Sequence, residues 1–130
     1  MNRNWLLAGA LLGALAVILG AFAAHSLKSV FPPESLAIFE TGVRYQWYHV
    51  FAIFIAVLLR NQFPDNSFIR RAAPLFAIGI ILFSGSLYVL AALKSNGRTG
   101  LGTIGIVTPI GGLFFIAGWI SMAIGIWRSK

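Results

Sequence analysis

Hydrophobic residues run along this chain in four long stretches, and polar residues gather between them. The clearest stretch is Trp5–Ala24, which carries no charged residue. A helix of about 20 residues, rising about 1.5 Å per residue, crosses a hydrocarbon core of about 30 Å, so this stretch predicts a membrane span. Its start and the small residues at 21–24 also imitate a signal peptide. The apolar run is longer than the usual 7–15 residues or so, and we expect it to remain uncleaved.

The second span has a less uniform pattern, because its uncharged part covers only residues 45–59. A helix that begins after Pro32-Pro33, with Glu34 in its first turn, would lengthen it, since proline is common at the first position of a helix. We therefore predict one helix over residues 34–59 whose first part lies in the outer interface. The remaining predicted spans are residues 72–93 and 104–127. The expected fold is an all-α integral membrane bundle of four helices in a single domain, 1–130.

The composition supports a membrane protein and argues against a nucleic-acid-binding protein. The chain is 58% hydrophobic and 10% charged, against about 45–50% and about 25% in soluble domains. Its net charge of +7 would suggest nucleic acid in a soluble domain. Here the basic residues lie at the ends of apolar stretches, which is typical of topology signals and lipid-headgroup contacts, so we expect no nucleic-acid partner. The chain has no cysteine, which excludes disulfides and thiol chemistry.

The distribution of basic residues predicts an orientation. Four crossings place both termini on the same side as the loop at 60–71. The basic residues on that side are Arg3, Arg60, Arg70, Arg71, Arg128 and Lys130, with Asp65 as the acidic one. The other side has Lys28, Arg44, Lys94 and Arg98, together with Glu34 and Glu40. By the positive-inside rule, we expect both termini in the cytoplasm.

Small residues recur every three or four positions on two spans. On the first span they are Gly9, Gly13, Ala16, Gly20 and Ala24, and on the fourth they are Ala117, Ser121 and Gly125. Such stripes let helices approach closely in lipid, either within the bundle or between copies of the chain. Because four short helices offer few other stabilising surfaces, we expect a homo-oligomer that uses these stripes, with membrane lipids as the other partners.

Polar side chains inside the spans are costly and therefore mark candidate sites. Depth counted along the helices places them mostly in the outer half of the bundle. The candidate ligand-binding or network residues are His25, Glu40, Arg44, Tyr45, Gln46, Tyr48, His49, Ser84, Ser86, Tyr88 and Thr108. Glu40 and Arg44 have the spacing of a favourable helical ion pair. His49 lies roughly 16 Å from the level of Arg60, close to the bilayer midplane.

Three functions agree with this pattern to different degrees. The favoured one is a non-enzymatic protein that binds a lipid, a small ligand or a partner helix through the outer polar residues. A transporter or proton-coupled conduit would use His49 and Glu40, but the cytoplasmic halves of the helices lack polar residues to continue the path. An intramembrane enzyme would use His25 or His49 as base and Ser84, Ser86 or a tyrosine as acid or nucleophile. The one aspartate, Asp65, lies in the opposite loop and cannot orient a histidine. We expect no catalytic residues, no metal and no cofactor.

Four blocks of sequence carry a resemblance. They are GAFAAHSL at 20–27, FETGVRYQWYHVFAI at 39–53, FSGSLYVL at 83–90 and TPIGGLFFIAGW at 108–119. In this order they resemble the family called domain of unknown function 423, with Ala23 where glycine is usual. The resemblance implies a small four-span protein of the bacterial inner membrane with no established activity. The motif residues carried over are His25, Glu40, Thr41, Gly42, Tyr45, Gln46, Tyr48, His49, Ser84, Gly85, Ser86, Tyr88, Thr108, Pro109, Gly111, Gly112 and Trp119.

Overall fold

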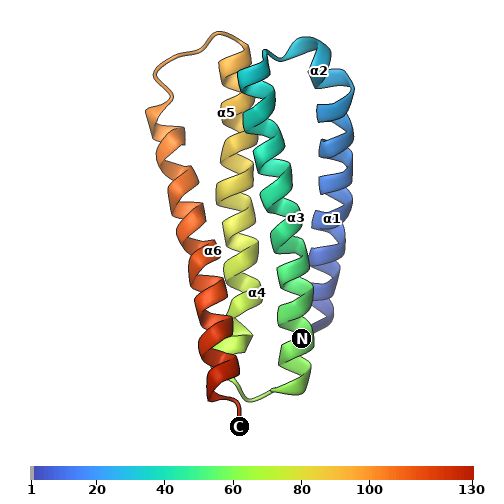
Figure 1. Ribbon diagram of the computed structural model, residues 1–130, viewed down its shortest axis with the longest axis vertical. Coiled ribbons are helices and arrows are strands. Elements are labelled where there is room, and N and C mark those ends of the chain that lie inside the picture. Colours follow the sequence, from blue (N-terminus) through green and yellow to red (C-terminus); the bar gives the residue numbers. More distant parts are fainter. Residues whose placement is uncertain (1) are drawn as a thin grey trace.

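The computed structural model describes residues 2–130, and helices account for nearly all of them (Figure 1). In chain order they are α1 (Asn2–Ala24), α2 (Ser26–Val30), α3 (Pro33–Gln62), α4 (Ser67–Gly79), the π-helical turn η1 (Ile80–Ser84), α5 (Gly85–Ser95) and α6 (Gly102–Arg128). Four helical stretches are long and apolar enough to cross a membrane: Asn2–Val30, Pro33–Gln62, Ser67–Ser95 and Gly102–Arg128. The prediction of an all-α bundle of four spans is confirmed.

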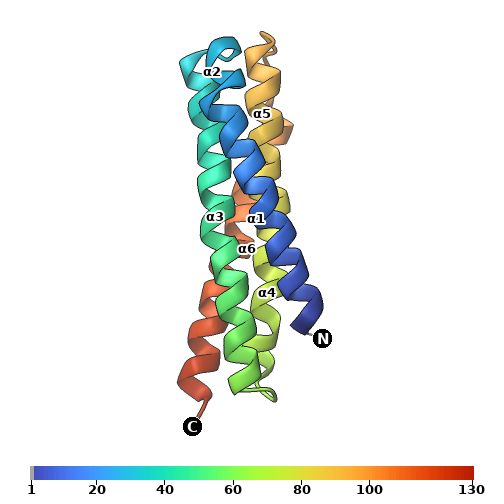
Figure 2. The ribbon, with the colours of Figure 1, turned by 90° about the vertical axis from the view of Figure 1, so that its right-hand side faces the viewer.

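The helices stand side by side, with α6 at one edge and α1 at the other. Figure 1 shows α6 next to α4 and α5, then α3, then α1, and Figure 2 also places α1 and α6 on opposite sides of the molecule. The two chain ends and the loop between α3 and α4 lie at the same end of the bundle. This arrangement leaves one side of α3 facing α1 and another facing α6.

Each stretch is longer than the apolar pattern predicted. The expected spans were residues 5–24, 34–59, 72–93 and 104–127, whereas the helices continue for several residues beyond most of these limits. The apolar pattern marks the part of a helix that lies in hydrocarbon, but backbone hydrogen bonding continues into the polar interface. Local signals set the observed ends. Pro33 begins α3 with its fixed φ, and the side chain of Asn66 caps α4 by accepting the N–H groups of Phe68 and Ile69.

Two spans have features that the periodic pattern did not predict. In the first, α1 ends at Ala24, the residue at which the predicted span ends, but the unpredicted short helix α2 follows His25. The third widens into the π-helical turn η1, where the N–H of Gly85 reaches back to the carbonyl of Ile80. A π turn adds one residue to a helical turn and is frequent at functional sites. Here it brings the backbone of Phe83 so close to α6 that a Cβ at Gly111 would overlap it.

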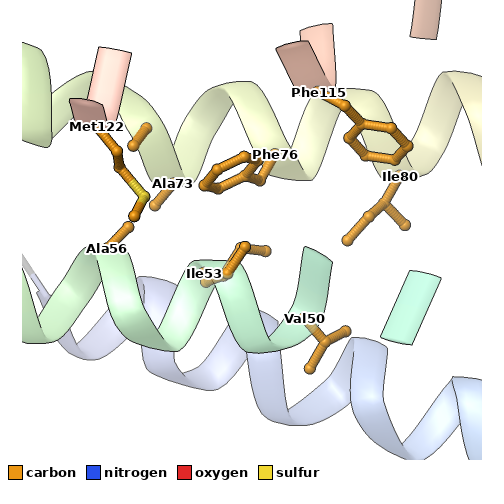
Figure 3. Packing of buried hydrophobic residues seen from close by; sticks show 10 residues of the cluster. Val50, Ile53, Ala56, Ala73, Phe76, Ile80, Phe115 and Met122 are labelled. Carbon is orange, nitrogen blue, oxygen red and sulfur yellow. The ribbon is translucent and has the colours of Figure 1, made fainter. Parts of the chain in front are cut away.

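The core lies between α3, α4 and α6. Figure 3 shows Phe76 at its centre, with Ile53 and Val50 of α3 on one side and Phe115 of α6 on the other. On α6 the close contacts are made by Gly111, Gly118 and Gly125, which are spaced seven residues apart and meet Phe83, Phe76 and Ile69. The stripe predicted on this helix is therefore only partly the contact face. Ser121 and Gly125 are buried, but Ala117 is exposed.

The small residues of α1 face α3. Gly9 packs on the ring of Phe54, Gly13 lies 3.6 Å from Val50 and Gly20 lies 3.6 Å from Val43, each distance measured to where a Cβ would stand. Gly9, Gly13 and Ala16 are buried, whereas Ala24 is exposed. Most of this stripe is thus occupied within the chain. The homo-oligomer that was expected to use it stays a prediction.

The predicted ion pair between Glu40 and Arg44 does not form. Both side chains are exposed on α3, and within residues 2–130 the salt bridge joins Lys94 to Glu34 at 3.2 Å. An exposed helical pair gains only a few tenths of a kcal/mol, about as much as is lost by fixing two long side chains. The observed bridge instead connects α3 and α5 at the end of the bundle away from the chain termini.

Candidate functional site

A hollow between α3 and α6 is the main concave feature near the predicted polar residues. Its volume is about 530 Å³, and we call it the aromatic groove. It is lined by Tyr45, Tyr48 and His49 of α3, Phe83 of η1, and Gly112, Phe115, Ile116 and Trp119 of α6. It lies on the side of α3 away from α1 and is open at the surface of the bundle. Small-molecule pockets typically measure about 300–1,000 Å³, so the groove has the size of a ligand site.

His49 forms the deep end of the groove and has a partner for each ring nitrogen. The indole N–H of Trp119 donates to Nε2 at 3.1 Å, and Nδ1 lies 2.7 Å from the carbonyl oxygen of Tyr45. Because an indole can only donate and a carbonyl can only accept, Nε2 accepts and Nδ1 carries the proton. The imidazole is therefore neutral in this arrangement. It is 4% exposed.

Aromatic rings hold this imidazole in place. Phe115 stacks on His49 with ring centroids 3.5 Å apart and planes 6° apart. Phe76 lies 5.6 Å away on the core side, and Trp119 contacts the imidazole edge-on at 6.1 Å. With both nitrogens bonded and the ring plane fixed, His49 shapes the groove and offers it no free hydrogen-bonding atom.

The two tyrosines of the groove are different, because their hydroxyls are free. Tyr45 is 37% exposed and Tyr48 is 52% exposed, and neither hydroxyl has a hydrogen-bond partner among residues 2–130. Their rings contact each other at 5.6 Å, and Tyr45 also packs on Phe83 at 4.8 Å. The groove thus combines apolar walls with two available phenol groups.

A second polar group lies on another side of α3 and is closed. The hydroxyl of Tyr88 donates to Oε1 of Gln46 at 2.7 Å, and Nε2 of Gln46 donates to the carbonyl of Leu12 at 2.7 Å. Ser84 donates to the carbonyl of Gly42 at 2.7 Å. These bonds connect α1, α3 and the third span, and Gln46 is only 1% exposed. This group holds the bundle together and has no opening for a ligand.

The remaining candidates stand apart from both groups. Ser86 and Thr108 bond to each other at 2.6 Å between α5 and α6, and Ser86 also donates to the carbonyl of Phe83. His25, Glu40 and Arg44 are exposed toward the end of the bundle away from the chain termini. Since Arg44 precedes Tyr48 by four residues, it lies on the same face of α3, one turn farther out. The structure therefore distributes the predicted residues over several places.

Five lining residues of the groove were not among the predicted site residues: Phe83, Gly112, Phe115, Ile116 and Trp119, of which Gly112 and Trp119 had been noted as motif residues of the resembling family. The sequence carried a signal for three of them. Phe115, Ile116 and Trp119 follow Gly112 at intervals of three, four and seven, which places them on one face of α6. The site prediction considered only polar side chains and therefore missed these apolar residues. Phe83 had no such signal, because the π turn decides where it points.

The donor set limits the chemistry of this site. In the part of the chain that the structure describes, no three His, Cys, Asp or Glu side chains are grouped to hold a metal ion. Ser84, Ser86 and Ser121 donate to carbonyl oxygens, and none of the three has a histidine partner. What the groove offers is apolar contact, aromatic faces and two phenol hydroxyls.

Several known proteins are similar to this chain. A UPF0382 membrane protein of Haemophilus influenzae is 44% identical over 130 residues, covering 100% of this chain and 98% of the relative. The UPF0382 membrane protein YwdK of Bacillus subtilis is 37% identical and covers 94% of each chain. The UPF0382 inner membrane protein YgdD of Escherichia coli is 35% identical, covering 99% of this chain and 93% of the relative.

No solved structure matches the chain. A family described as "Protein of unknown function (DUF423)" matches residues 19–112, a segment that contains α3, the third span and the start of α6. That match and the full-length relatives agree with the resemblance noted in the sequence. This chain is a membrane protein that belongs to the DUF423 family.

Proposed function

We propose that this protein is a non-enzymatic lipid-binding protein of the inner membrane that holds an acyl chain of a phospholipid in the aromatic groove. The observation that carries the proposal is the groove itself: an apolar hollow of about 530 Å³ on the membrane-facing surface of the bundle, with two free phenol hydroxyls. Its position between two spans makes it accessible from the hydrocarbon core.

A lipid chain suits the walls of the groove. Phe83, Phe115 and Ile116 present hydrocarbon, and Gly112 contributes no side chain, which leaves room beside them. Water is scarce at this depth, so an apolar hollow that opens sideways is filled from the bilayer. Hydrophobic contact with surrounding lipid gives no advantage to an ordinary helix surface. A concave surface differs, because it surrounds a chain on several sides and gains more dispersion contacts.

The free hydroxyls indicate which end of the lipid lies nearby. Tyr45 is 15 positions before Arg60 on α3, so its Cα lies roughly 22 Å from that end of the span. Side chains on a helix lean toward its N-terminus, which for α3 is the outer end. The hydroxyls of Tyr45 and Tyr48 therefore extend toward the level of the ester carbonyls. Arg44, one turn farther out and exposed, is positioned to meet a phosphate.

The hydrogen bonds described above favour binding over the two alternatives. A proton conduit needs a titrating group with a free nitrogen, but both nitrogens of His49 are engaged by Trp119 and the backbone. A hydrolase needs a serine activated by a base, but Ser84 donates to a helix carbonyl. No observation favours either activity.

The test fills the groove. A leucine in place of Gly112 would occupy the hollow, and its Cβ would meet Phe83 only at an ordinary 3.8 Å. The matched control is Gly105→Leu on the same helix, where a Cβ has nothing within 4 Å. The measurement is native mass spectrometry of protein released from nanodiscs of phosphatidylglycerol and phosphatidylethanolamine, counting the phospholipids that stay bound.

The wild-type chain and Gly105→Leu should retain the same number of phospholipids, and Gly112→Leu should retain one fewer. Equal retention by all three folded proteins would contradict the proposal. Loss in both variants would also contradict it, because the effect would then come from helix α6 in general and not from the groove.

A further inference from the structure

A cluster of basic side chains stands at the opposite end of the molecule from Arg44, where the chain termini and the loop between α3 and α4 meet. Its members are Arg3, Arg60, Arg70, Arg71, Arg128 and Lys130, and Asp65 is the acidic residue near them. The only salt bridge within residues 2–130 is at the other end of the bundle, between Lys94 and Glu34. Within residues 2–130, none of these basic groups forms a salt bridge, and Asp65 is one acidic side chain against six basic ones.

Two of these arginines are held by one aromatic ring. The guanidinium carbon of Arg128 lies 5.0 Å from the ring centroid of Phe68, and that of Arg71 lies 5.9 Å from the same centroid. Cations within about 6 Å of a ring centroid are attracted by its electron-rich face. Because both guanidinium groups contact the same ring, Arg71 of α4 and Arg128 of α6 stay near each other although their positive charges repel.

The backbone beneath the arginines is fixed by Asn66. Its Nδ2 donates to the carbonyl of Gly125 at 2.8 Å and to the hydroxyl of Ser129 at 2.9 Å, while its Oδ1 caps α4. The start of α4 is thereby joined to the end of α6. The hollow beside this junction measures about 380 Å³, and Arg128, Lys130 and Asp65 are among its lining residues.

Trp127 places this cluster at the membrane surface. It is 81% exposed and adjoins Arg128 at the end of the fourth span. Exposed tryptophans at span ends sit at the level of lipid headgroups. Unpaired guanidiniums at that level face phosphates, to which arginine binds with two parallel hydrogen bonds.

We propose that the two arginines held on Phe68 form a binding site for the headgroup of an anionic phospholipid, with its phosphate between α4 and α6. The proposal is independent of the aromatic groove, which lies between α3 and α6 nearer the middle of the bundle. A hydrogen bond to a charged group changes affinity about tenfold or more, so the two guanidiniums together account for at least that much.

The experiment titrates purified protein in detergent with phosphatidylglycerol or phosphatidylcholine and measures bound lipid by native mass spectrometry. The variant Arg71→Gln/Arg128→Gln is compared with Lys28→Gln/Arg98→Gln, which removes the same charge at the other end. We expect the first to bind phosphatidylglycerol at least about tenfold more weakly and the control to bind as the wild type does. Phosphatidylcholine binding should be unchanged in both.

Two further measurements distinguish a specific headgroup site from attraction by the net charge of the protein. Phe68→Leu keeps both guanidiniums but removes the ring that holds them, and it should weaken phosphatidylglycerol binding several-fold. For the wild-type chain, binding should fall as sodium chloride rises, and inorganic phosphate should not displace the lipid. The titrations of the wild-type chain with salt and with inorganic phosphate test the headgroup site even if the double variant does not fold.

The proposal is overturned by equal affinity of the wild-type chain for the two lipids or by affinity that is insensitive to salt. An equal loss in the control variant would reduce the effect to net charge, and displacement by inorganic phosphate would make free phosphate the ligand. Neither outcome is compatible with a headgroup site. Gly112→Leu should leave phosphatidylglycerol binding at this end intact, so the failure of one proposal is distinguishable from the failure of the other.

Discussion

At the scale of the residue, the two large buried polar side chains of α3, Gln46 and His49, have partners on neighbouring helices. Gln46 bonds to α1 and to Tyr88, and His49 bonds to Trp119 and to its own helix. In hydrocarbon an unsatisfied polar group costs several kcal/mol, so each of these bonds specifies how its helix is rotated. Polarity in this span is therefore mainly structural, and the atoms free for binding belong to the tyrosines of the aromatic groove.

We predict that Trp119→Phe lowers the free energy of unfolding by about 0.5–1.5 kcal/mol, because it removes the donor to His49 in a setting where such bonds average about 0.6 kcal/mol. The measurement is equilibrium unfolding in mixed micelles. Trp127→Phe is the matched control, since Trp127 is 81% exposed and should leave stability unchanged. A Trp119→Phe variant as stable as the wild type would mean that the indole does not bond to the imidazole.

The same residues show what sequence can predict of a site. Counting along α3 predicted that His49 lies deep and that Arg44 lies farther out. It did not predict which neighbour each side chain faces, because that depends on how the helices pack. Gln46 and Tyr45 are adjacent in sequence, yet one is in the closed group and the other is in the groove.

At the scale of the element, glycine spacing determines how α6 packs. Gly111, Gly118 and Gly125 recur every seven residues and allow the third span to approach until its side chains or backbone touch α6. Without a hydrophobic drive between helices in lipid, such close contact is a main source of their association. This face of α6 is used within the chain, and the groove lies along the neighbouring face.

A single added methyl group tests this contact. Gly111→Ala should destabilise the bundle by about 1–3 kcal/mol, because the new Cβ would overlap the backbone of Phe83, which has no rotamer to move. Gly105→Ala, with open space around its Cβ, should be neutral or stabilise by up to about 1 kcal/mol. Unfolding in mixed micelles compares the two, and equal stabilities would show that α6 does not approach Phe83 so closely.

The helices themselves were predictable because their signal is long and uniform. Four apolar stretches with polar loops gave the number of spans and most of each helix. The break at His25 and the π turn at Ile80–Ser84 were not predictable in the same way. Each changes the path of a helix without changing its composition. The position of the groove depends on the second of these, because η1 supplies Phe83.

At the scale of the whole molecule, the groove exists because α1 and α6 pack at different edges of the bundle (Figures 1 and 2). α1 packs on another side of α3, and α6 forms the wall opposite Tyr45 and Tyr48 without closing the groove. The two proposed lipid sites then lie at different depths, one inside the hydrocarbon and one at the end where the basic residues gather. A homo-oligomer remains a prediction, and its interface would need faces other than the part of α1 that contacts α3.

The basic end of the molecule also predicts its orientation. By the positive-inside rule the chain termini and the α3–α4 loop should lie in the cytoplasm. Because the chain has no cysteine, single cysteines at Asn96 and Lys130 report the two sides cleanly. A membrane-impermeant maleimide should label Asn96→Cys in intact bacterial protoplasts and Lys130→Cys only after permeabilisation. The reverse labelling would place the basic cluster outside.

The central claim, that the aromatic groove holds a lipid chain, is tested most directly by photo-crosslinking in the membrane. A phospholipid with a diazirine in its acyl chain is reconstituted with the wild-type chain or with Gly112→Leu, and adducts are mapped by peptide mass spectrometry. We expect adducts concentrated in residues 45–49 and 112–119 of the wild type and lost from these segments in Gly112→Leu. Adducts spread equally over all membrane-facing helices, including the exposed Leu11 and Val17 of α1, and unchanged by Gly112→Leu would contradict the claim.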